Sequence, residues 1–573
     1  MKRAIVLIIG LTSLSLACVV WGGEAGKYPP PRFPSYLKAP KSVEDVMPFA
    51  RAVARQTSGL QGEGLGSLKS GETVALVTEA SSEDMIIEAI KRAAEERGVK
   101  VQPLPSYELA GVSRADALEL RKARQQSTAE QGYMEARRWI EEMFPDPEVP
   151  KKWLKERRPD LYDALYPPAR SQLPEKLREV QKKLERENVA KGIKEYLEKN
   201  PAVKGVFWGT GGTTTLRRFM RPHEDKFLGV NVFDNRWTMM SKISAFPGDV
   251  WRLAEERTIE SIGWTDRLQI TDPEGTNLAA DLTEDMAARW ARGVYQQGHL
   301  YMFPNQATGR FPYSVVEYPA FQKKWNARSP TPRASGVIAG TANHAGHYPR
   351  VEVHLKDGYI NEVKGGGVYG ELWREFLKYP KINEVTYPYH DRPGYWQLYE
   401  AALGTNPKYF KRPDENLRGD NVTERNRSGV MHYGHGIRVH HSPDSPEWAK
   451  EWVEFTTKNN LPNDHWFHVH NYFSTYRLRV RGTKNTWVTV INNGRMTALD
   501  GPEVRALASR YGDPKELLAE DWIPQIPGIN ATGRYEEYAK DPWKTVSQVF
   551  KKVEDGSYEH FYPALKKAAG GNQ

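Results

Sequence analysis

Cysteine is almost absent from this chain, because Cys18 is the single cysteine among 573 residues. One thiol cannot build an internal disulfide framework or a thiolate metal cluster. Hydrophobic residues make up 39% of the chain and charged residues 27%. This balance excludes a wholly disordered or fibrous protein, and the length favours about two to four structural units over a single core.

Charge of one sign is also not concentrated anywhere. Lys and Arg number 81 against 72 Asp and Glu, a net charge of +9, and acidic side chains are interleaved with the basic ones. Without a basic stripe that could follow phosphates, we expect no nucleic-acid partner. A dinucleotide fingerprint is missing too, because Gly62, Gly64 and Gly66 precede a strand instead of following it.

The N-terminus has the features of an export signal. Lys2 and Arg3 precede an apolar run over residues 4–20, and small residues follow. We therefore interpret residues 1–25 as a signal peptide and expect a secreted or periplasmic protein. A lipid anchor at Cys18 is the alternative, but the residues before it fit a lipidation box poorly. No later run is apolar enough for a membrane span, so none is expected after signal removal.

The first half of the chain predicts an α/β domain with a parallel sheet. A Pro-rich, extended lead-in is expected over residues 26–70. An apolar strand over 71–77, a helix with one apolar face, and a second strand over 99–104 form a βαβ unit. We assign residues 71–268 to this domain. The charged, helical stretch at about 114–200 is interpreted as a solvated insertion that packs by one face.

The second half predicts a mixed α+β, β-rich domain over residues 269–520. Short alternating strands and turns dominate it, and residues 351–363 form a hairpin with Asp357-Gly358 as its turn. A C-terminal extension, 521–573, follows. We leave open a homo-oligomer in which this extension covers another subunit's site.

Histidine placement points to chemistry in this second domain. Seven of the 14 histidines lie between 432 and 470. In His468-Val469-His470 the two imidazoles share one face of a strand, and His432 lies on a nearby apolar segment. Histidine is the commonest metal ligand, so we predict a metal site at His432, His468 and His470. Nitrogen and oxygen donors admit Fe(II), Zn(II), Mn(II) or Cu(II).

Two further features are candidates for the same site. His344 and His347 lie in a Gly-containing loop and could line the substrate pocket or bind a second metal. Glu400, on an apparent short helix that stops at Gly404, stands among apolar neighbours. It could be a metal ligand or a general base.

These segments together resemble the thermophilic metallo-aminopeptidase (aminopeptidase T) family. The resemblance rests on the strand at 71–77, the segment Thr271–Asn277, the hairpin, Glu400 with its following GTNP, His432, and the HVH at 468–470. It implies an N-terminal α/β domain and a C-terminal domain that holds two metals and the substrate cleft. Glu400, His432 and His468 match metal ligands of that family.

Three positions depart from the family's ligand set. His470 replaces an aspartate, the segment Met302–Thr308 lacks the expected glutamate, and Val439 stands where a ligand tyrosine is expected. Two-metal hydrolysis needs oxygen donors that hold and bridge a close metal pair.

The chain also looks like dihydroxypyridine dioxygenase, which shares this fold. That resemblance implies one Fe(II) at positions matching His432, His468 and His470, here a three-histidine site. It makes Glu400 or His435 the group that moves protons, and makes Tyr433 and Tyr472 part of an aromatic pocket.

Three functions therefore remain as hypotheses. The first is a secreted mononuclear non-haem iron enzyme, dioxygenase-like, that acts on an aromatic or unsaturated small molecule. The second is a metallo-aminopeptidase that uses Zn(II) or Co(II). The third is a non-catalytic binding protein on the same fold.

Overall fold

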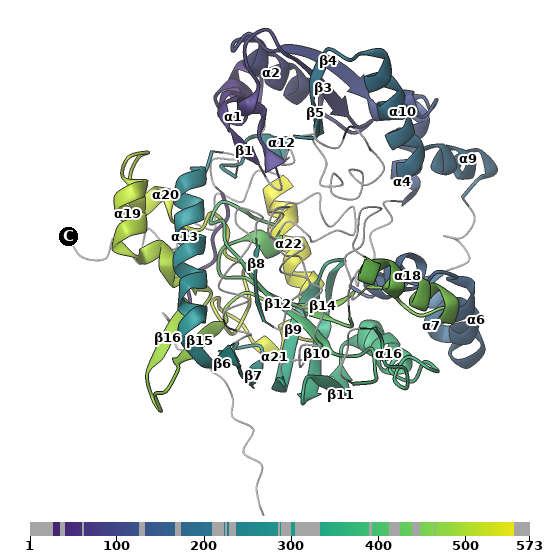
Figure 1. Cartoon of the computed structure of the whole chain (residues 1–573), viewed down its shortest axis with the longest axis vertical. Helices are drawn as coiled ribbons and strands as arrows, with labels where there is room; N and C mark the ends of the chain where they lie inside the picture. The colour runs from purple at the N-terminus through teal and green to yellow at the C-terminus, as the bar shows by residue number, and fades with distance from the viewer. Residues whose placement is uncertain are drawn as a thin grey trace, which may run out of the picture.

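Figure 1 shows the computed structural model of the protein. The described residues are 27–34, 40–59, 62–124, 132–166, 173–208, 223, 226–228, 236–243, 245–284, 287, 299–303, 333–388, 392–411, 424–437, 447–464 and 466–554. The predicted signal peptide and Val439 lie outside these residues, as do positions 304–308 of the segment that begins at Met302.

A three-stranded parallel sheet forms the N-terminal part, in the order β4–β3–β5 (Figure 1). Its strands are β3 (Thr73–Thr78), β4 (Lys100–Pro105) and β5 (Val203–Trp208). Helix α2 (Asp84–Glu95) joins β3 to β4 and buries Ile86, Ile90, Ala93 and Ala94 along one face. The predicted βαβ unit is confirmed, because the helical period of these residues matches a face that covers the sheet.

Part of the expected lead-in is helical. Helix α1 (Val43–Arg55) buries Val46, Ala50, Val53 and Ala54 in the same core cluster as α2. The Asp45 side chain accepts from the backbone N–H of Ser42 at 3.0 Å and satisfies a donor at the helix start. The prediction of an extended segment missed this helix, because it was based on the prolines before residue 41 and not on the helical spacing of the apolar residues after it. The short strands β1 (Ser58–Gly59) and β2 (Gly62–Glu63) follow α1.

Two antiparallel sheets form the second half. The larger has the order β11–β10–β9–β7–β6–β15–β16–β17, and the smaller β14–β13–β12–β8. The larger sheet contains β6 (Thr265–Thr271), β7 (Asn277–Asp281), β9 (Ser335–Asn343), β10 (Gly346–Lys356), β11 (Tyr359–Gly365), β15 (Thr475–Val480), β16 (Trp487–Asn492) and β17 (Arg495–Met496). The smaller contains β8 (His299–Phe303), β12 (Leu398–Gly404), β13 (Met431–His435) and β14 (Phe467–Asn471). The predicted hairpin is confirmed as β10–β11, and Asp357 and Gly358 both have positive φ, as its tight turn requires.

The charged helical stretch divides between the two halves. Its members are α4 (Arg114–Arg124), α5 (Met134–Met143), α6 (Glu148–Arg157), α7 (Pro159–Leu165), α9 (Glu175–Lys183) and α10 (Arg186–Lys199). Figure 1 shows α4, α9 and α10 beside the parallel sheet, whereas α6 and α7 lie with the second half, near α16 (Gly367–Phe376). Trp139 of α5 contacts Phe376, Trp396 and Phe467. This part of the stretch packs by one face into the core of the second half, so it is not an insertion within the α/β domain.

Helix α13 (Gly248–Glu260) also packs with the second half. Its Trp251 side chain donates to Thr405 at 2.9 Å and belongs to the core cluster of the antiparallel sheets. The packing therefore does not follow the expected boundary near residue 268. The remaining helices are α3 (Ser106–Leu109), α12 (Arg236–Met239), α18 (Glu447–Asn459), α19 (Pro502–Ala508), α20 (Pro514–Leu517), α21 (Tyr535–Tyr538) and α22 (Pro542–Glu554).

The C-terminal extension, as far as it is described, packs on its own chain. The Asp521 N–H donates to the Pro407 carbonyl at 2.8 Å, and the Arg350 N–H donates to the Ala539 carbonyl at 2.7 Å. Tyr538 contacts Thr341 on β9. These contacts tie the extension to the antiparallel sheets. Among the described helices, none is long and apolar enough to cross a membrane.

Candidate metal centre

The register of two strands of the smaller sheet brings the predicted histidines together. His432 on β13 lies directly opposite His470 on β14, and Gly434 lies opposite His468. Alternate residues of a strand share a face, so His468 and His470 both face the side on which His432 lies. All five residues of each strand are buried.

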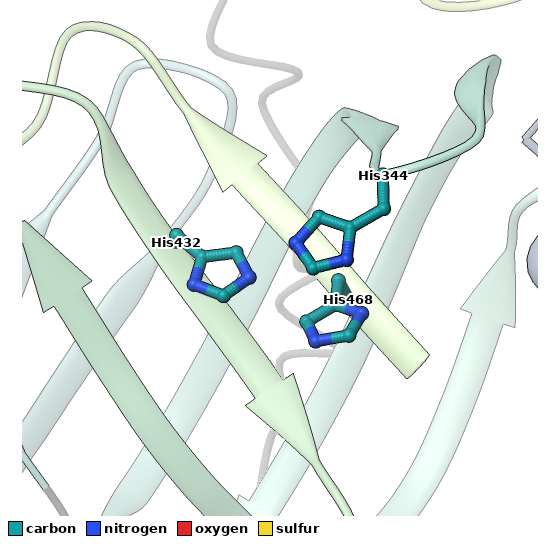
Figure 2. Close-up of side chains that lie close together, drawn as sticks. All are labelled: His344, His432 and His468. Carbon is teal, nitrogen blue, oxygen red and sulfur yellow. The ribbon is translucent and has the colours of Figure 1, made fainter. Parts of the chain in front are cut away.

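A fourth imidazole joins from the larger sheet. His344 follows β9 in the turn to β10, and Figure 2 shows its ring beside those of His432 and His468. Its ring centroid lies 3.8 Å from that of His468, 4.7 Å from that of His432 and 5.2 Å from that of His470. We call these four side chains, His344, His432, His468 and His470, the imidazole cluster.

Close approach of β14 to β9 depends on a glycine. A Cβ at Gly340 would lie 2.7 Å from a methyl carbon of Val469 and 2.9 Å from the His470 carbonyl. These separations are too short for a side chain. Gly340 therefore allows the two sheets to pack tightly enough for His344 to reach the cluster.

Three imidazoles have a carboxylate at Nδ1. Glu400 Oε1 lies 3.0 Å from Nδ1 of His432, Glu135 Oε1 lies 2.5 Å from that of His468, and Glu424 Oε1 lies 3.1 Å from that of His470. A carboxylate in this position fixes the ring's orientation and tautomer and makes the other nitrogen more basic. Nε2 is then the nitrogen of each ring that could bind a metal.

His344 has a different environment. Nη1 of Arg425 lies 2.6 Å from its Nε2, and Glu135 Oε1 lies 3.9 Å from its Nδ1. Because a guanidinium can only donate, Nε2 of His344 accepts this hydrogen bond. Its lone pair is thus engaged, whereas Nε2 of His470 has no hydrogen-bond partner among the described residues.

Burial keeps the imidazoles in the form that binds metals. Burial lowers the pKa of His432 to about 3, in spite of the nearby Glu400, and lowers the pKa of His470 as well. The pKa of His344 is held well below its usual range by burial and by the neighbouring rings. Neutral imidazoles need no deprotonation before they bind a metal.

The Glu424 carboxylate remains charged in the interior. Burial alone would raise its pKa, but Lys411, 3.1 Å from Glu424 Oε2, and the hydrogen bond with His470 together lower it to about 2. Tyr472 donates to the same carboxylate at 2.6 Å. The carboxylate is therefore firmly held while it orients His470.

The donor set fits one divalent metal. Nε2 of His470 is buried and has no hydrogen-bond partner among the residues that the structure describes. One nitrogen from each of His344, His432 and His468 lies within 4.8 Å of the others. Two nitrogens bound to one metal at about 2.1 Å are at most about 4.2 Å apart, so modest ring movements would bring nitrogens of His344, His432 and His468 to one metal, and the His470 ring lies 5.2 Å from those of His344 and His432.

The other candidate residues lie in three places. His347 is buried, and its Nε2 lies 2.6 Å from Nζ of Lys411. Tyr472 supports Glu424 behind the cluster. Tyr433 and His435 are at the alternate positions of β13, on the opposite face from His432. His435 bonds to the Phe467 carbonyl and packs edge-on against Trp373, so its position does not support a role in proton transfer.

Glu400 reaches the cluster from a strand, not from the predicted helix. The sequence LYEAALG favours a helix by local propensity, but every residue of β12 is buried between neighbouring strands. Tertiary packing overrides such a weak preference. The predicted inward direction of Glu400 agrees with its contact to His432.

Sequence reasoning missed Glu135, Glu424 and Arg425. Glu135 is on α5, four residues before Trp139, so an acidic residue on the buried face of an amphipathic helix was the available signal. Tyr369 also donates to Glu135, at 2.5 Å. Glu424 and Arg425 lie in a short helical turn, η4 (Glu424–Asn426), whose sequence carries no such signal.

Comparisons with known proteins agree with the two resemblances. No family model matches the sequence, and no curated protein does. The structure is similar to 2,5-dihydroxypyridine dioxygenase from Pseudomonas putida KT2440, with a TM-score of 0.38 and 10% identity over 81% of this chain and 100% of that one. It is also similar to AmpT from Thermus thermophilus, with a TM-score of 0.32 and 15% identity over 79% of this chain and 98% of that one.

Proposed function

We propose that this protein is an exported, mononuclear metal enzyme of the non-haem iron type, which oxidises an aromatic or unsaturated small molecule. The observation that carries the proposal is the set of three imidazole–carboxylate pairs on adjoining strands. His432, His468 and His470 would hold the metal through Nε2. The predicted export signal in residues 1–25 supports a location outside the cytoplasm.

The protein's own groups have defined roles in this proposal. A bound Fe(II) supplies open coordination positions at which substrate and O₂ can be held side by side. Glu135, Glu400 and Glu424 orient the three rings, so Glu400 acts as a positioning residue at His432. Burial of all three rings excludes bulk water from the centre.

The aminopeptidase hypothesis fits the same centre less well. Two-metal hydrolysis needs carboxylates that hold and bridge the metals. Here the nearby carboxylates Glu135, Glu400 and Glu424 each contact an imidazole nitrogen. A three-histidine site with one metal is the simpler match to these contacts.

The decisive experiment measures metal content and activity together. The protein is purified without oxygen, loaded with Fe(II), and assayed for O₂ uptake with hydroxylated aromatics and for cleavage of aminoacyl anilides. One iron per chain with O₂ uptake supports the proposal. Two metals with anilide cleavage would establish the aminopeptidase hypothesis, and metal binding without either activity would favour a binding protein.

A matched pair of variants locates the metal. His468→Ala should abolish stoichiometric metal binding. His354→Ala should retain it, because His354 lies on β10 against Glu352 and outside the imidazole cluster. Retained metal stoichiometry in His468→Ala would refute the assigned site.

A further inference from the structure

One cation lies in direct contact with the imidazole cluster. Arg425 is partly exposed, unlike the four buried rings, and its guanidinium donates to His344. Guanidinium keeps its charge at any physiological pH. A permanent positive charge therefore stands directly beside the candidate metal centre.

The charge of Arg425 lies close to where a metal would be held. Its Nη1 is 2.6 Å from Nε2 of His344, whose ring centroid lies 3.8 Å from that of His468. A divalent metal held by the cluster would therefore experience this charge. Like charges repel strongly in a poorly solvated centre, and an anion that contacts both of them would offset the repulsion.

Lys411, which is buried beside Glu424 and His347, differs from Arg425, which is partly exposed.

We propose that Arg425 binds a carboxylate of the substrate, so that the enzyme acts on acidic aromatic or unsaturated molecules. This inference rests on the proposed function, because the substrate's second polar group would reach the metal. A planar guanidinium matches a carboxylate with two parallel hydrogen bonds, which gives direction as well as affinity. Arg425 is thus the residue that selects acidic over neutral substrates.

The test uses a pair of probes with almost equal shape. Binding of 2-hydroxybenzoate and neutral 2-hydroxybenzamide to the anaerobic Fe(II)-loaded protein is measured by calorimetry. Wild type should bind the benzoate more tightly. Arg425→Gln should weaken benzoate binding about 10- to 100-fold and change benzamide binding by less than about threefold, and Arg425→Lys should fall between. Arg477→Gln, an equal charge change on β15, should leave both affinities unchanged.

Metal affinity separates substrate binding from a structural role. Removal of a neighbouring cation should leave metal affinity unchanged or raise it in Arg425→Gln. A fall of tenfold or more would show that Arg425 only holds His344 in place and would overturn the inference. The inference would also be overturned if Arg425→Gln changed the benzoate affinity by less than twofold, or if phosphate bound more tightly than the benzoate.

Failure of the proposed function gives a different result. If wild type binds no metal, the same titration is made with the metal-free protein. Benzoate binding that depends on Arg425 would then uphold the carboxylate site without the metal, and its absence would overturn both proposals.

Discussion

Two buried polar centres in the second half of the molecule satisfy their groups in different ways. The Lys408 ammonium donates to the carbonyls of Glu516 and Ala519 and to Asp521, at 2.9, 2.8 and 3.1 Å. Its three donors meet three acceptors from the same chain. In the imidazole cluster, a carboxylate lies at one nitrogen of three rings, and Nε2 of His470 is buried with no hydrogen-bond partner among the described residues.

This difference distinguishes a buried polar centre that stabilises the fold from one that can bind a ligand. A buried charge that is fully satisfied within the chain fixes one conformation and requires nothing further. Donor atoms that are oriented but incompletely satisfied are costly unless another group completes them. The Lys408 centre therefore ties the C-terminal extension to the sheet, whereas the imidazole cluster has the form of a binding site.

The largest effect on stability is expected at the Lys408 centre. Lys408→Met removes the cation from a buried ion pair with Asp521 and should lower the free energy of unfolding by about 3 to 5 kcal/mol, as measured by denaturant titration. Lys364→Met, in the exposed pair with Glu362, should cost less than about 1 kcal/mol. Similar losses of stability in the two variants would contradict the distinction between the buried and the exposed ion pair.

The imidazole cluster should respond to metal instead. At a free metal concentration of 100 times Kd, the free energy of unfolding should rise by about 2.7 kcal/mol, because only the folded state presents the site. Thermal unfolding with and without Fe(II) or Zn(II) measures this gain. His470→Ala should lose it and His354→Ala should keep it. An equal gain in both variants would contradict the assignment of His470.

Glu135 should be important for metal affinity although it would not contact the metal. Glu135→Ala removes the acceptor at Nδ1 of His468 and should weaken metal binding about 10- to 100-fold. Glu135→Gln keeps an acceptor and should lose less. Glu141→Ala, on the exposed face of the same helix, is the matched control. Unchanged affinity in Glu135→Ala would show that orientation of His468 does not depend on α5.

A third buried centre gives an effect that depends on pH. Burial and the neighbouring Asp272 raise the pKa of Glu274, so the folded state holds its proton more tightly than the unfolded state. Stability should therefore fall as pH rises above the ordinary glutamate pKa of about 4.3, through the raised pKa of the folded state. Glu274→Gln should remove this part of the pH dependence in denaturant titrations from pH 4 to 9. An unchanged dependence of the free energy of unfolding on pH in Glu274→Gln would refute this role of Glu274.

Local patterns in the sequence predicted those features that depend on local spacing. The βαβ unit, the β10–β11 hairpin and the shared face of His468 and His470 all follow from strand and helix periods. Alternation along β13 also separates His432 from Tyr433 and His435, although the sequence analysis placed all three in one site. The two-residue alternation of side chains along a strand was enough to separate these residues, so the sequence contained the information for this distinction.

The sequence by itself determined that imidazoles, in a chain with one cysteine, are the main candidates to hold a metal. Only the tertiary structure decided which groups surround them. Glu135 comes from a helix 333 residues before His468, and His344 comes from another sheet. Such contacts depend on how whole elements pack, through Trp139 on α5 and Gly340 on β9, and no local period encodes that packing.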